Sequence, residues 1–296
     1  MNNIPIYNEE LNDEDIYKLF FEESGCLIIK HVFNSKIMSE YNEFCYENFD
    51  EIINTQRNSS HPKQKDKITI NDLLERLSIQ NPKLLMKLIN NEKLNKIIDI
   101  LLGFGTIGSM STHCIKPGGK RQKSHVDYPL HIGSGLFWEN NKNLIDEYLT
   151  KYQLNYIMPY YSVQCFIASD SCDESNGSTE LIPGSHTIID VDKKILDNNF
   201  YNSLEDKFIN VKLEKGDVLL FNRGLIHRGG YNKSNYNRNS CIIQYVWLFG
   251  IGQALRNSNL IFKNLEDEFN KLNIEEKKKL MYRIKQPYPI DVREHN

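Results

Sequence analysis

The chain has 296 residues, of which 40% are hydrophobic, 11% aromatic and 25% charged, and its formal net charge is −3. These values are typical of a folded protein with a sizeable core, and they exclude a disordered chain. Charges of both signs are interspersed, so nothing attracts the protein to phosphate backbones or anionic membranes. We therefore expect neither nucleic acid nor a membrane as a partner, and the sequence indicates no particular oligomeric state.

The amino-terminal segment and the cysteines both bear on the cellular compartment. Residues 1–17 lack a basic stretch followed by an apolar one, and no apolar run approaches the roughly 18 residues of a membrane span. The cysteines form no C-x-x-C pair, which argues against a zinc site and favours reduced thiols. We therefore expect a cytoplasmic protein. The six cysteines are Cys26, Cys45, Cys114, Cys165, Cys172 and Cys241.

Residues 1–105 have the pattern of a mostly helical region. Apolar residues recur three and four positions apart in EDIYKLFFEE, in KIMSEYNEFCYENF and in the long stretch NDLLERLSIQNPKLLMKLINNEKLNKIIDILLG. The segment CLIIKHVF, directly after Gly25, predicts one short strand within this region. The basic residues Lys63, Lys65 and Lys67 are typical of a solvated loop.

From residue 106 the pattern changes to short β-prone runs separated by turns. The Pro-Gly-Gly at 117–119 predicts a tight turn that joins two antiparallel strands, TIGSMSTHCIK and RQKSHVD. The tail from Leu260 is again typical of helices, until the prolines of KQPYPIDV end them. Further strands are predicted at 160–168, 178–183, 207–213, 217–222 and 238–249.

This order of elements predicts an α+β protein with a mainly β core. Many short strands with long loops indicate a β-sandwich or jelly roll, with N-terminal helices packed on one sheet and a helical C-terminal tail. No repeat or linker divides the chain, so we expect residues 1–296 to form a single domain. Its expected parts are a helical region (1–105), a core (106–250) with a lid-like insertion (128–160) and a helical extension (251–296).

The stretch SHVD places a histidine and a carboxylate on one face of a strand. Because successive side chains of a strand point to opposite sides, His125 and Asp127 project together. Two histidines and one carboxylate suit Fe(II) and leave coordination positions open. Among the other histidines, His227 is the best third ligand, since it closes a β-prone run and the two glycines at 229–230 let the backbone bend near a ligand. His113 and His131 are expected to be hydrogen-bonded polar groups.

Arg238 follows His227 by eleven residues, at the start of the last long strand. If the intervening segment is a hairpin loop, Arg238 lies beside the metal-bearing strand. Its planar guanidinium could then bind a carboxylate through two hydrogen bonds. This spacing fits a dicarboxylate that chelates the metal at one end and contacts Arg238 at the other.

Several motifs in order now resemble one family, the phytanoyl-CoA dioxygenase (PhyH-like) branch of the Fe(II) and 2-oxoglutarate dependent oxygenases. QKSHVD is similar to the family's Q-x-x-H-x-D, and ESNGSTELIPGSH is similar to its Asn-Gly followed by Pro-Gly-Ser-His. KGDVLLFNRGLIHRGG with Arg238 downstream, and FFEESGCLIIKHVF near the amino terminus, also resemble family segments. The resemblance covers roughly residues 15–250.

The resemblance implies a double-stranded β-helix, which is a cupin-like jelly roll. It implies that His125, Asp127 and His227 bind Fe(II), and that Arg238 binds the distal carboxylate of 2-oxoglutarate. It further implies that O2 is consumed, that succinate and CO2 are released, and that a substrate is hydroxylated or otherwise oxidised. His186, in the Pro-Gly-Ser-His turn, is expected to be architectural.

Two positions depart from the family pattern. Some relatives have an aromatic residue where this chain has Ser124, and some have a hydroxyl residue where it has Gly229. Thr112, on the preceding strand, could supply a secondary contact to 2-oxoglutarate instead.

Strand phase indicates which residues line the pocket. In YYSVQCFIA the face with Gln164 is mixed and polar, whereas the opposite face is uniformly apolar, so Gln164 is a candidate contact of the cofactor. Gln244 is in phase with Arg238 on the last strand and is a second candidate. Both glutamines could instead satisfy buried backbone groups. The insertion 128–160 is typical of a lid, with Tyr128 and Trp138 as possible contacts.

The expected partner is a small-molecule substrate, a small polar metabolite rather than a fatty acyl thioester. Two other functions compete with the dioxygenase. One is a non-catalytic jelly-roll module that binds a metal or a small acid. The other is a zinc hydrolase, which fits less well because no general base is evident.

Overall fold

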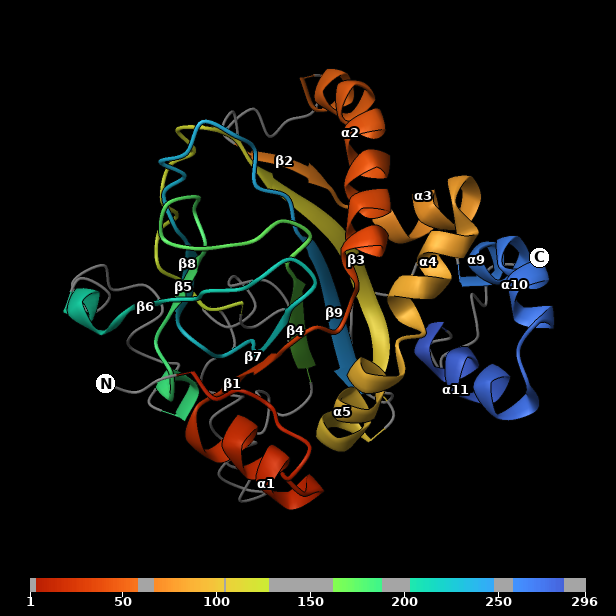
Figure 1. Ribbon diagram of the computed structural model, residues 1–296, viewed down its shortest axis with the longest axis horizontal. Coiled ribbons are helices and arrows are strands. Elements are labelled where there is room, and N and C mark those ends of the chain that lie inside the picture. The colour runs from red at the N-terminus through yellow and green to blue at the C-terminus, as the bar shows by residue number, and fades with distance from the viewer. Residues whose placement is uncertain are drawn as a thin grey trace, which may run out of the picture.

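A computed structural model describes residues 4–57, 67–103, 105–127, 162–187, 203–247 and 258–284. Within these ranges the strands form two antiparallel sheets, with helices against one of them (Figure 1). The predicted combination of helices with antiparallel sheets is therefore confirmed. The described strands form two separate sheets rather than one closed barrel.

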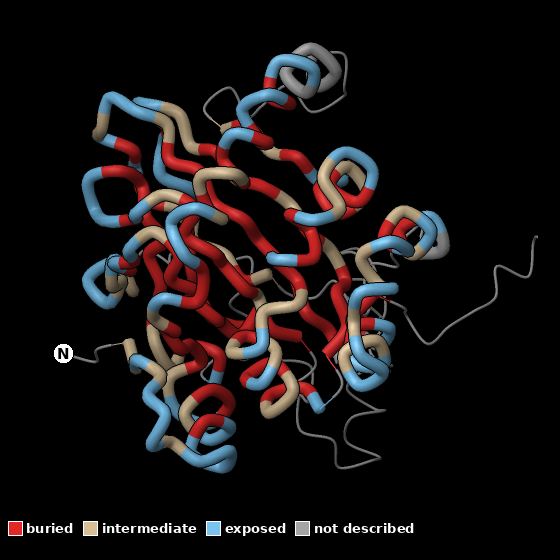
Figure 2. Tube along the Cα trace, turned by 45° about the vertical axis from the view of Figure 1, so that its right-hand side comes forward, coloured by how far each residue is buried: buried red, intermediate tan, exposed pale blue. Residues whose placement is uncertain are grey.

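The larger sheet has six strands, and each neighbouring pair is antiparallel. Its central strands are buried on both sides, which Figure 2 shows as red segments in the middle of the molecule. In spatial order the strands are β1 (Cys26–Ile29), β7 (Val218–Asn222), β4 (Ser162–Ile167), β9 (Cys241–Trp247), β3 (Gly105–Ile115) and β2 (Lys67–Ile70).

The smaller sheet contains β6 (Ile209–Asn210), β5 (Thr179–Leu181) and β8 (His227–Gly229), in that order. Its residue Leu181 joins Phe166, Leu219 and Phe221 of the larger sheet in one buried apolar cluster. The two sheets therefore pack face to face through their apolar side chains.

Helices cover the other face of the larger sheet. They are α2 (Ser35–Arg57), α3 (Leu73–Gln80), α4 (Pro82–Ile89), α5 (Glu92–Leu102), α9 (Ser258–Asn264), α10 (Glu266–Asn270) and α11 (Ile274–Ile284), and α1 (Asp13–Lys18) lies at the edge beside β1 (Figure 1). A short π-helical turn (Leu19–Glu23) follows α1, and single 3₁₀ turns occur at Ser185–Thr187 and Glu205–Lys207. No helix in the described part of the chain is long and apolar enough to cross a membrane.

Local sequence signals explain where these helices begin and end. Asn81 caps α4, since its Oδ1 accepts a hydrogen bond from Leu84 N (3.1 Å), and Pro82 occupies the first helical position. Asn91 caps α5 in the same way through Leu94 N (3.0 Å). Helix α5 ends at Gly103, whose φ of 66° is unfavourable for a residue with a Cβ atom.

Successive side chains of β4 point alternately to the two faces of the larger sheet, as the sequence predicted. In β4, Val163, Cys165 and Ile167 belong to the core that includes the helices, whereas Gln164 and Phe166 are on the face toward the smaller sheet. We call this second face the inner face. The six cysteines are free and buried, as expected for reduced thiols.

Two expectations for the edge of the sheet are wrong. The Pro-Gly-Gly turn forms, with Gly119 N bonded to Lys116 O (2.9 Å), but the chain after it does not return along β3. It crosses to residues 227–232, where Gly118 N binds Asn232 O (2.9 Å). The place beside β3 is taken by β2, which pairs Lys67 with Ile115, so Lys67 lies in a sheet and not in a solvated loop.

Candidate metal centre

Three side chains predicted as ligands come together between the two sheets. His227 is the first residue of β8, and His125 forms a single antiparallel bridge with it through His125 N to His227 O (3.0 Å) and His227 N to His125 O (2.9 Å). Asp127 is fixed by its backbone N–H, which donates to Arg223 O (2.9 Å). Backbone hydrogen bonds thus hold both histidines and the carboxylate before any ligand binds.

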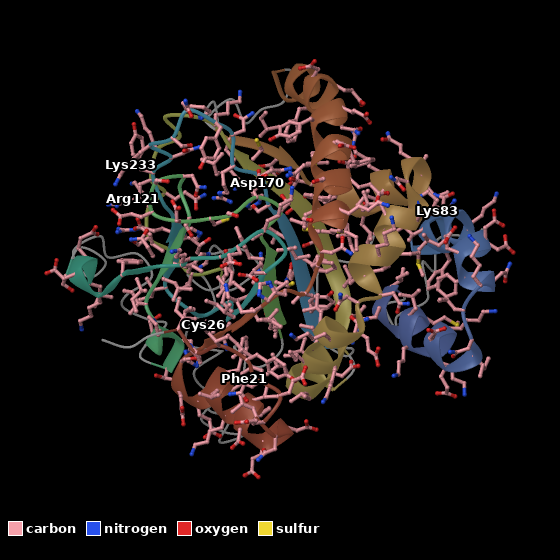
Figure 3. The ribbon with its side chains drawn as sticks, viewed as in Figure 1. Phe21, Cys26, Lys83, Arg121, Asp170 and Lys233 are labelled. Carbon is pink, nitrogen blue, oxygen red and sulfur yellow. The ribbon has the colours of Figure 1, made fainter. Side chains whose placement is uncertain are left out.

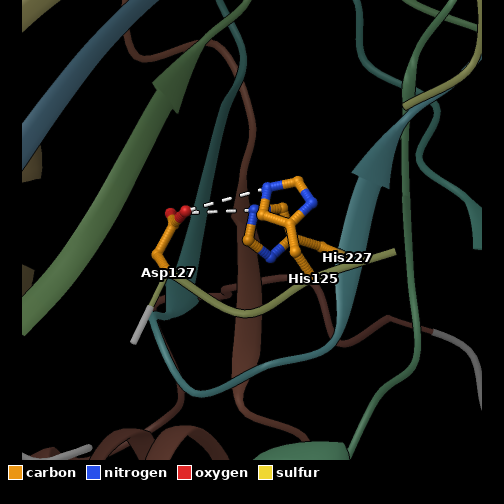
Figure 4. Close-up of side chains that lie close together, drawn as sticks. All are labelled: His125, Asp127 and His227. Atoms are coloured by element: carbon orange, nitrogen blue, oxygen red, sulfur yellow. Dashed lines mark ion pairs between the residues drawn. The ribbon is translucent and has the colours of Figure 1, made fainter. Parts of the chain in front are cut away.

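The side chains of His125, Asp127 and His227 converge (Figure 4). Their potential ligand atoms all lie within 4.8 Å of one another. His125 Nε2 is 3.9 Å from Asp127 Oδ1, and His227 Nε2 is 3.7 Å from Asp127 Oδ2. Among the described residues this is the one group of three or more metal-binding side chains with such spacing.

Hydrogen bonds at the other ring nitrogens fix the tautomers of the histidines. His125 Nδ1 is 2.8 Å from Lys123 O, and His227 Nδ1 is 2.9 Å from Leu225 O. A carbonyl oxygen only accepts, so in a neutral ring each Nδ1 carries the hydrogen and donates it. Each Nε2 is then left with a lone pair that points toward Asp127, as metal-binding histidines require.

Burial and charge favour the metal-binding form of His227. Its side chain is 9% exposed, and burial lowers its pKa, although the Asp127 carboxylate opposes this shift. A lowered pKa keeps the imidazole neutral near pH 7, and only the neutral ring can bind a metal. The side chains of His125 and Asp127 are 41% and 25% exposed, so the open side of the group lies next to them. The donor set of two imidazoles and one carboxylate fits Fe(II).

The glutamine of QKSHVD has a structural role that the motif alone did not reveal. Gln122 Oε1 accepts a hydrogen bond from Gly229 N (2.7 Å), and Gln122 N donates to Gly229 O (2.9 Å). A Cβ atom on Gly229 would lie 2.9 Å from that same Oε1. Gln122 therefore sets the register of the His125 segment on β8, and its position explains why a glycine stands at 229.

The outer side of β8 is held by an ion-pair network centred on the buried Arg228 and Glu180. Arg228 donates from Nε to Glu180 Oε2 (2.5 Å) and binds Glu205 through both Nη atoms (2.7 Å each). Arg121 joins the network through Glu180 (3.0 Å), and it lies on this side of the molecule in Figure 3. The guanidinium of Arg228 also lies 3.9 Å from the centre of the Phe208 ring. The network fixes the strand that carries His227.

Arg238 lies on the inner face, but not where the hairpin prediction placed it. It pairs with Ile115 of β3 in the larger sheet, so the segment after His227 crosses from one sheet to the other. The side chain is buried, with Nη1 bonded to Ser240 Oγ (3.0 Å) and Nη2 bonded to Gly177 O (2.6 Å). Its Nε has no hydrogen-bond partner within the described ranges.

Lys67 is a second cation in the same row, and sequence reasoning missed it. Lys67, Ile115 and Arg238 are neighbours across β2, β3 and the segment that precedes β9, so they share the inner face. Burial, and then the charge of Arg238, lower the pKa of Lys67 to about 8, against the opposing effect of Asp127. His113, also on this face, has a pKa well below its usual value because of burial and these two cations.

The other predicted residues divide between the two faces. Thr112 is fully buried on the helical side, where its Oγ1 contacts Asn239 Oδ1 (2.7 Å) and Cys45 Sγ (3.8 Å), so it does not accompany the triad. Gln164 and Gln244 are direct partners on the inner face. His186 packs on Gly25 and binds Phe21 O (2.9 Å) through Nε2, an architectural contact. Tyr128, His131 and Trp138 lie outside the described residues.

Arg223 is an inner-face residue that the sequence did not single out. It is 4% exposed, and no described residue forms a hydrogen bond with its Nε or Nη1. Burial lowers its pKa, while the Asp127 carboxylate acts in the opposite direction. In the sequence it looks like an ordinary charged residue of a turn, and only its place in FNRGLIH, four residues before His227, could have drawn attention to it.

The same architecture occurs in enzymes that use non-haem iron. The structure is similar to that of the non-heme α-ketoglutarate dependent carbocyclase SnoK from nogalamycin biosynthesis, with a TM-score of 0.59, 14% identity and coverage of 87% of this chain and 93% of that one. The α-ketoglutarate dependent epimerase SnoN gives a TM-score of 0.58 at 14% identity, over 84% and 88% of the two chains. SnoN has also been solved with Fe³⁺, α-ketoglutarate and nogalamycin RO. At these identities the likeness is one of fold.

A sequence match identifies the family. Residues 21–240 match phytanoyl-CoA dioxygenase (PhyH), and this chain belongs to that family. Dioxygenase trt7 of Aspergillus terreus (strain NIH 2624 / FGSC A1156) is 21% identical over 214 residues, which cover 72% of this chain and 66% of trt7. The chain thus spans slightly less than two thirds of that relative. The resemblance inferred from the motifs is confirmed.

Proposed function

We propose that the protein is an Fe(II)- and 2-oxoglutarate-dependent dioxygenase that hydroxylates or otherwise oxidises a small polar metabolite. The observation that carries this proposal is the convergence of His125, Asp127 and His227 on the same inner face as two cations, the buried Arg238 and the partly buried Lys67. Iron and 2-oxoglutarate, when bound, would supply the oxidising chemistry. One O2 and one 2-oxoglutarate would give succinate, CO2 and one oxygen atom for the substrate.

In this proposal the triad holds the iron. The Nε2 atoms of His125 and His227 and one oxygen of Asp127 are the ligands, because these atoms already face one another and the histidine tautomers are suitable. Three protein ligands leave open positions for a chelating co-substrate and for O2. The carbonyl groups of Lys123 and Leu225 keep the rings oriented while the metal is absent.

Arg238 and Lys67 would bind the distal carboxylate of 2-oxoglutarate. The free Nε of Arg238 and the charge of Lys67 supply donors on one row of the inner face. Without a bound anion, the guanidinium and the ammonium repel each other. A carboxylate bound between them would offset that repulsion. Gln164, level with Phe221 beside His227, remains a predicted contact of the co-substrate.

The proposal includes the architecture around the site. The two facing sheets would form a double-stranded β-helix within a single domain over residues 1–296, with 128–160 as an insertion near the metal centre. The small-molecule substrate would bind next to the triad. Six buried free thiols suit a reducing compartment, so we place the protein in the cytoplasm.

A spectroscopic test without oxygen separates the candidate functions. Adding Fe(II) and 2-oxoglutarate to the protein should give a visible metal-to-ligand charge-transfer band. Arg238→Met should weaken 2-oxoglutarate binding at least about tenfold, because it removes a charge-assisted contact. Lys233→Met is the matched control, since Lys233 pairs with Glu174 on the surface and should leave the band unchanged. A zinc hydrolase would give no band.

Turnover then distinguishes an enzyme from a binding module. In a substrate screen with O2, the wild-type protein should form succinate, and Asp127→Ala should form none above background because the iron loses its anionic ligand. A charge-transfer band without turnover of any compound would favour the non-catalytic module. A fully active Asp127→Ala protein would refute the assignment of the triad.

A further inference from the structure

Arg223 is a buried cation, two of whose donor atoms have no hydrogen-bond partner among the described residues. It directly follows β7, and only 4% of its surface is exposed. Neither Nε nor Nη1 has a hydrogen-bond partner, and no ion pair connects its guanidinium with any residue in the described ranges. An isolated buried charge is strongly unfavourable, so buried arginines usually have acidic or carbonyl partners. The acceptor for Arg223 is missing from the described part of the protein.

A second unused donor lies close by on the same face. Phe221, two residues before Arg223, pairs with Gln164 of β4, and the partner of Gln164 in β9 is Gln244. Gln244 is 5% exposed, and its Oε1 accepts from Ser109 Oγ (3.1 Å). Its Nε2, a donor group, has no hydrogen-bond partner in the part of the chain that the structure describes. Two buried donors at one end of the inner face thus need an acceptor.

This end of the face adjoins the metal centre. The Phe221 ring, level with Gln164 and Gln244, lies 4.9 Å from the His227 ring. The charge of Arg223 is near enough to contribute to lowering the pKa of His227, and Asp127 N is bonded to Arg223 O (2.9 Å). The Asp127 carboxylate attracts the charge of Arg223, but its two oxygens face the histidine Nε2 atoms and form no ion pair with the guanidinium among the described residues.

The unused donors are separate from the row assigned to 2-oxoglutarate. Arg238 and Lys67 lie on either side of Ile115, and Arg238 is six residues away from Gln244 along the same chain segment. Residues six apart on an extended strand are roughly 20 Å apart. One short dicarboxylate that reaches the triad from Arg238 therefore leaves Arg223 and Gln244 without an acceptor.

We propose that Arg223 and Gln244 bind an acidic oxyanion group, a carboxylate or a phosphate monoester, of the primary substrate. This inference rests on the proposed function, because it takes Arg238 and Lys67 as the 2-oxoglutarate site. The planar guanidinium would donate two hydrogen bonds to the acid group, and Gln244 Nε2 would donate a third. The substrate class is thereby narrowed from polar metabolites to small organic acids, and an amine at this position would be repelled.

The first test measures stability without any ligand. Arg223→Met keeps the length of the side chain and removes the uncompensated charge, so it should raise the Tm of the metal-free protein. Arg121→Met is the matched control, because Arg121 has acidic partners in Glu180 and Glu205 and its loss should not raise the Tm. A purely structural arginine at 223 would give the opposite result, a lower Tm for Arg223→Met.

The second test measures recognition of the acid group. The protein is loaded with Ni(II) and 2-oxoglutarate, which occupy the triad and the Arg238 row. It is then titrated with acetate, hexanoate and benzoate, with their primary amides, and with phenyl phosphate. At least one acid should raise the Tm by about 3 °C near saturation, whereas its neutral counterpart should not. Carboxylates and phenyl phosphate in separate arms tell which acid group is preferred.

The variants decide the role of Arg223 in this response. Arg223→Met should abolish the acid-dependent shift, and Arg223→Lys should keep part of it because the charge remains. Equal shifts from acids and amides, no shift from any acid, or an undiminished shift in Arg223→Met would each overturn the inference.

The proposed function can fail independently of this inference. The charge-transfer band with Fe(II) and 2-oxoglutarate should persist in Arg223→Met, because neither ligand contacts this residue in our assignment. Loss of the band in that variant would mean that Arg223 positions Asp127 instead, and would overturn the inference. Absence of the band in the wild-type protein would overturn the proposed function while the acid-dependent shift could still be observed.

Discussion

At the scale of single residues, two cations that face each other across Ile115 dominate the inner face. Lys67 and Arg238 are held there by strand pairing, and no carboxylate is bonded to either of them within the described residues. This arrangement disfavours the charged form of Lys67: burial is the larger cause and the charge of Arg238 the smaller one, and together they lower the pKa of Lys67 to about 8. Such an arrangement is suited to an anionic ligand.

The lowered pKa of Lys67 predicts how pH affects the co-substrate. A dianion binds the charged form of Lys67, so affinity for 2-oxoglutarate should be constant below pH 8. Above pH 8 it should fall by up to about tenfold per pH unit as the lysine loses its proton. Calorimetric titration of the Ni(II)-loaded protein between pH 6.5 and 9.5 measures this.

A variant at the same position provides the control for this pH dependence. Lys67→Arg remains charged throughout the range, so its affinity should stay flat. A flat wild-type profile would mean that Lys67 does not contact the co-substrate.

The pH dependence of folding stability should have the opposite sign to that of co-substrate affinity. Because the charged form of Lys67 is disfavoured in the folded state, the contribution of Lys67 to the free energy of unfolding should increase as the pH rises from 8 toward the pKa of lysine in the unfolded chain.

At the scale of elements, β8 is three residues long and connects two different environments. His227 points to the metal centre, while its neighbour Arg228 points to the ion-pair network with Glu180 and Glu205. Because side chains alternate along a strand, the network on one side fixes the orientation of the ligand on the other. A strand this short gains little from its own ladder, so the ion pairs carry much of its anchoring.

Removing Arg228 should therefore affect both stability and metal binding. Arg228→Met leaves Glu180, which is 3% exposed, without its shortest ion pair, and unfolding free energy should fall by about 3 kcal/mol. Metal affinity should fall roughly tenfold because His227 is less well positioned. Urea denaturation and a metal titration measure the two effects. In Glu205→Gln, whose own side chain is 50% exposed, the loss should stay below about 1 kcal/mol.

At the scale of the whole molecule, the C-terminal helices belong to the same core as the sheet. Ile261, Leu265, Leu280 and Ile284 pack in the cluster that contains the outer face of the larger sheet. Arg283 connects its own helix, α11, with strand β3 and helix α5. It donates to Gly105 O (2.6 Å) at the start of β3, and to Asn95 O (2.9 Å) and Asp99 Oδ1 (2.7 Å) in α5.

This contact predicts that the helical extension stabilises the sheet. Arg283→Met should lower the free energy of unfolding by about 2–3 kcal/mol, because three hydrogen bonds from a buried guanidinium are lost. Lys278→Met, on the exposed side of the same helix, should change it by less than about 0.5 kcal/mol. Chemical denaturation of the two variants gives the comparison, and equal effects would show that the extension folds independently of the sheet.

Local patterns predicted those features that depend on neighbouring residues. The alternation in SHVD put His125 and Asp127 on one face, and the alternation in β4 put Gln164 on the inner face, as the structure has them. Helix caps and the Pro-Gly-Gly turn are equally local. For the same reason, motif order was sufficient to recognise the family.

Features that depend on distant pairing were missed. Lys67 looked solvated because its burial comes from Ile115, 48 positions along the chain, and the partner of the Pro-Gly-Gly segment comes from residues 227–232. The face on which Thr112 lies could not be predicted either, because the phase of β3, which contains an irregularity between Ile107 and Ser109, is set by its pairing with β9. Sequence analysis did not single out Arg223, because no local pattern indicates which partners a buried side chain will have.

The contact between Gly25 and His186 constrains how this scaffold can be engineered. A Cβ atom on Gly25, whose φ is 73°, would lie 2.4 Å from His186 Nδ1, and Gly184 N bonds Ser24 O (2.6 Å). The turn before β1 and the Pro-Gly-Ser-His turn are thus complementary surfaces although about 160 positions separate them. A chimera that takes one turn from a relative should therefore take both, since each is shaped to the other.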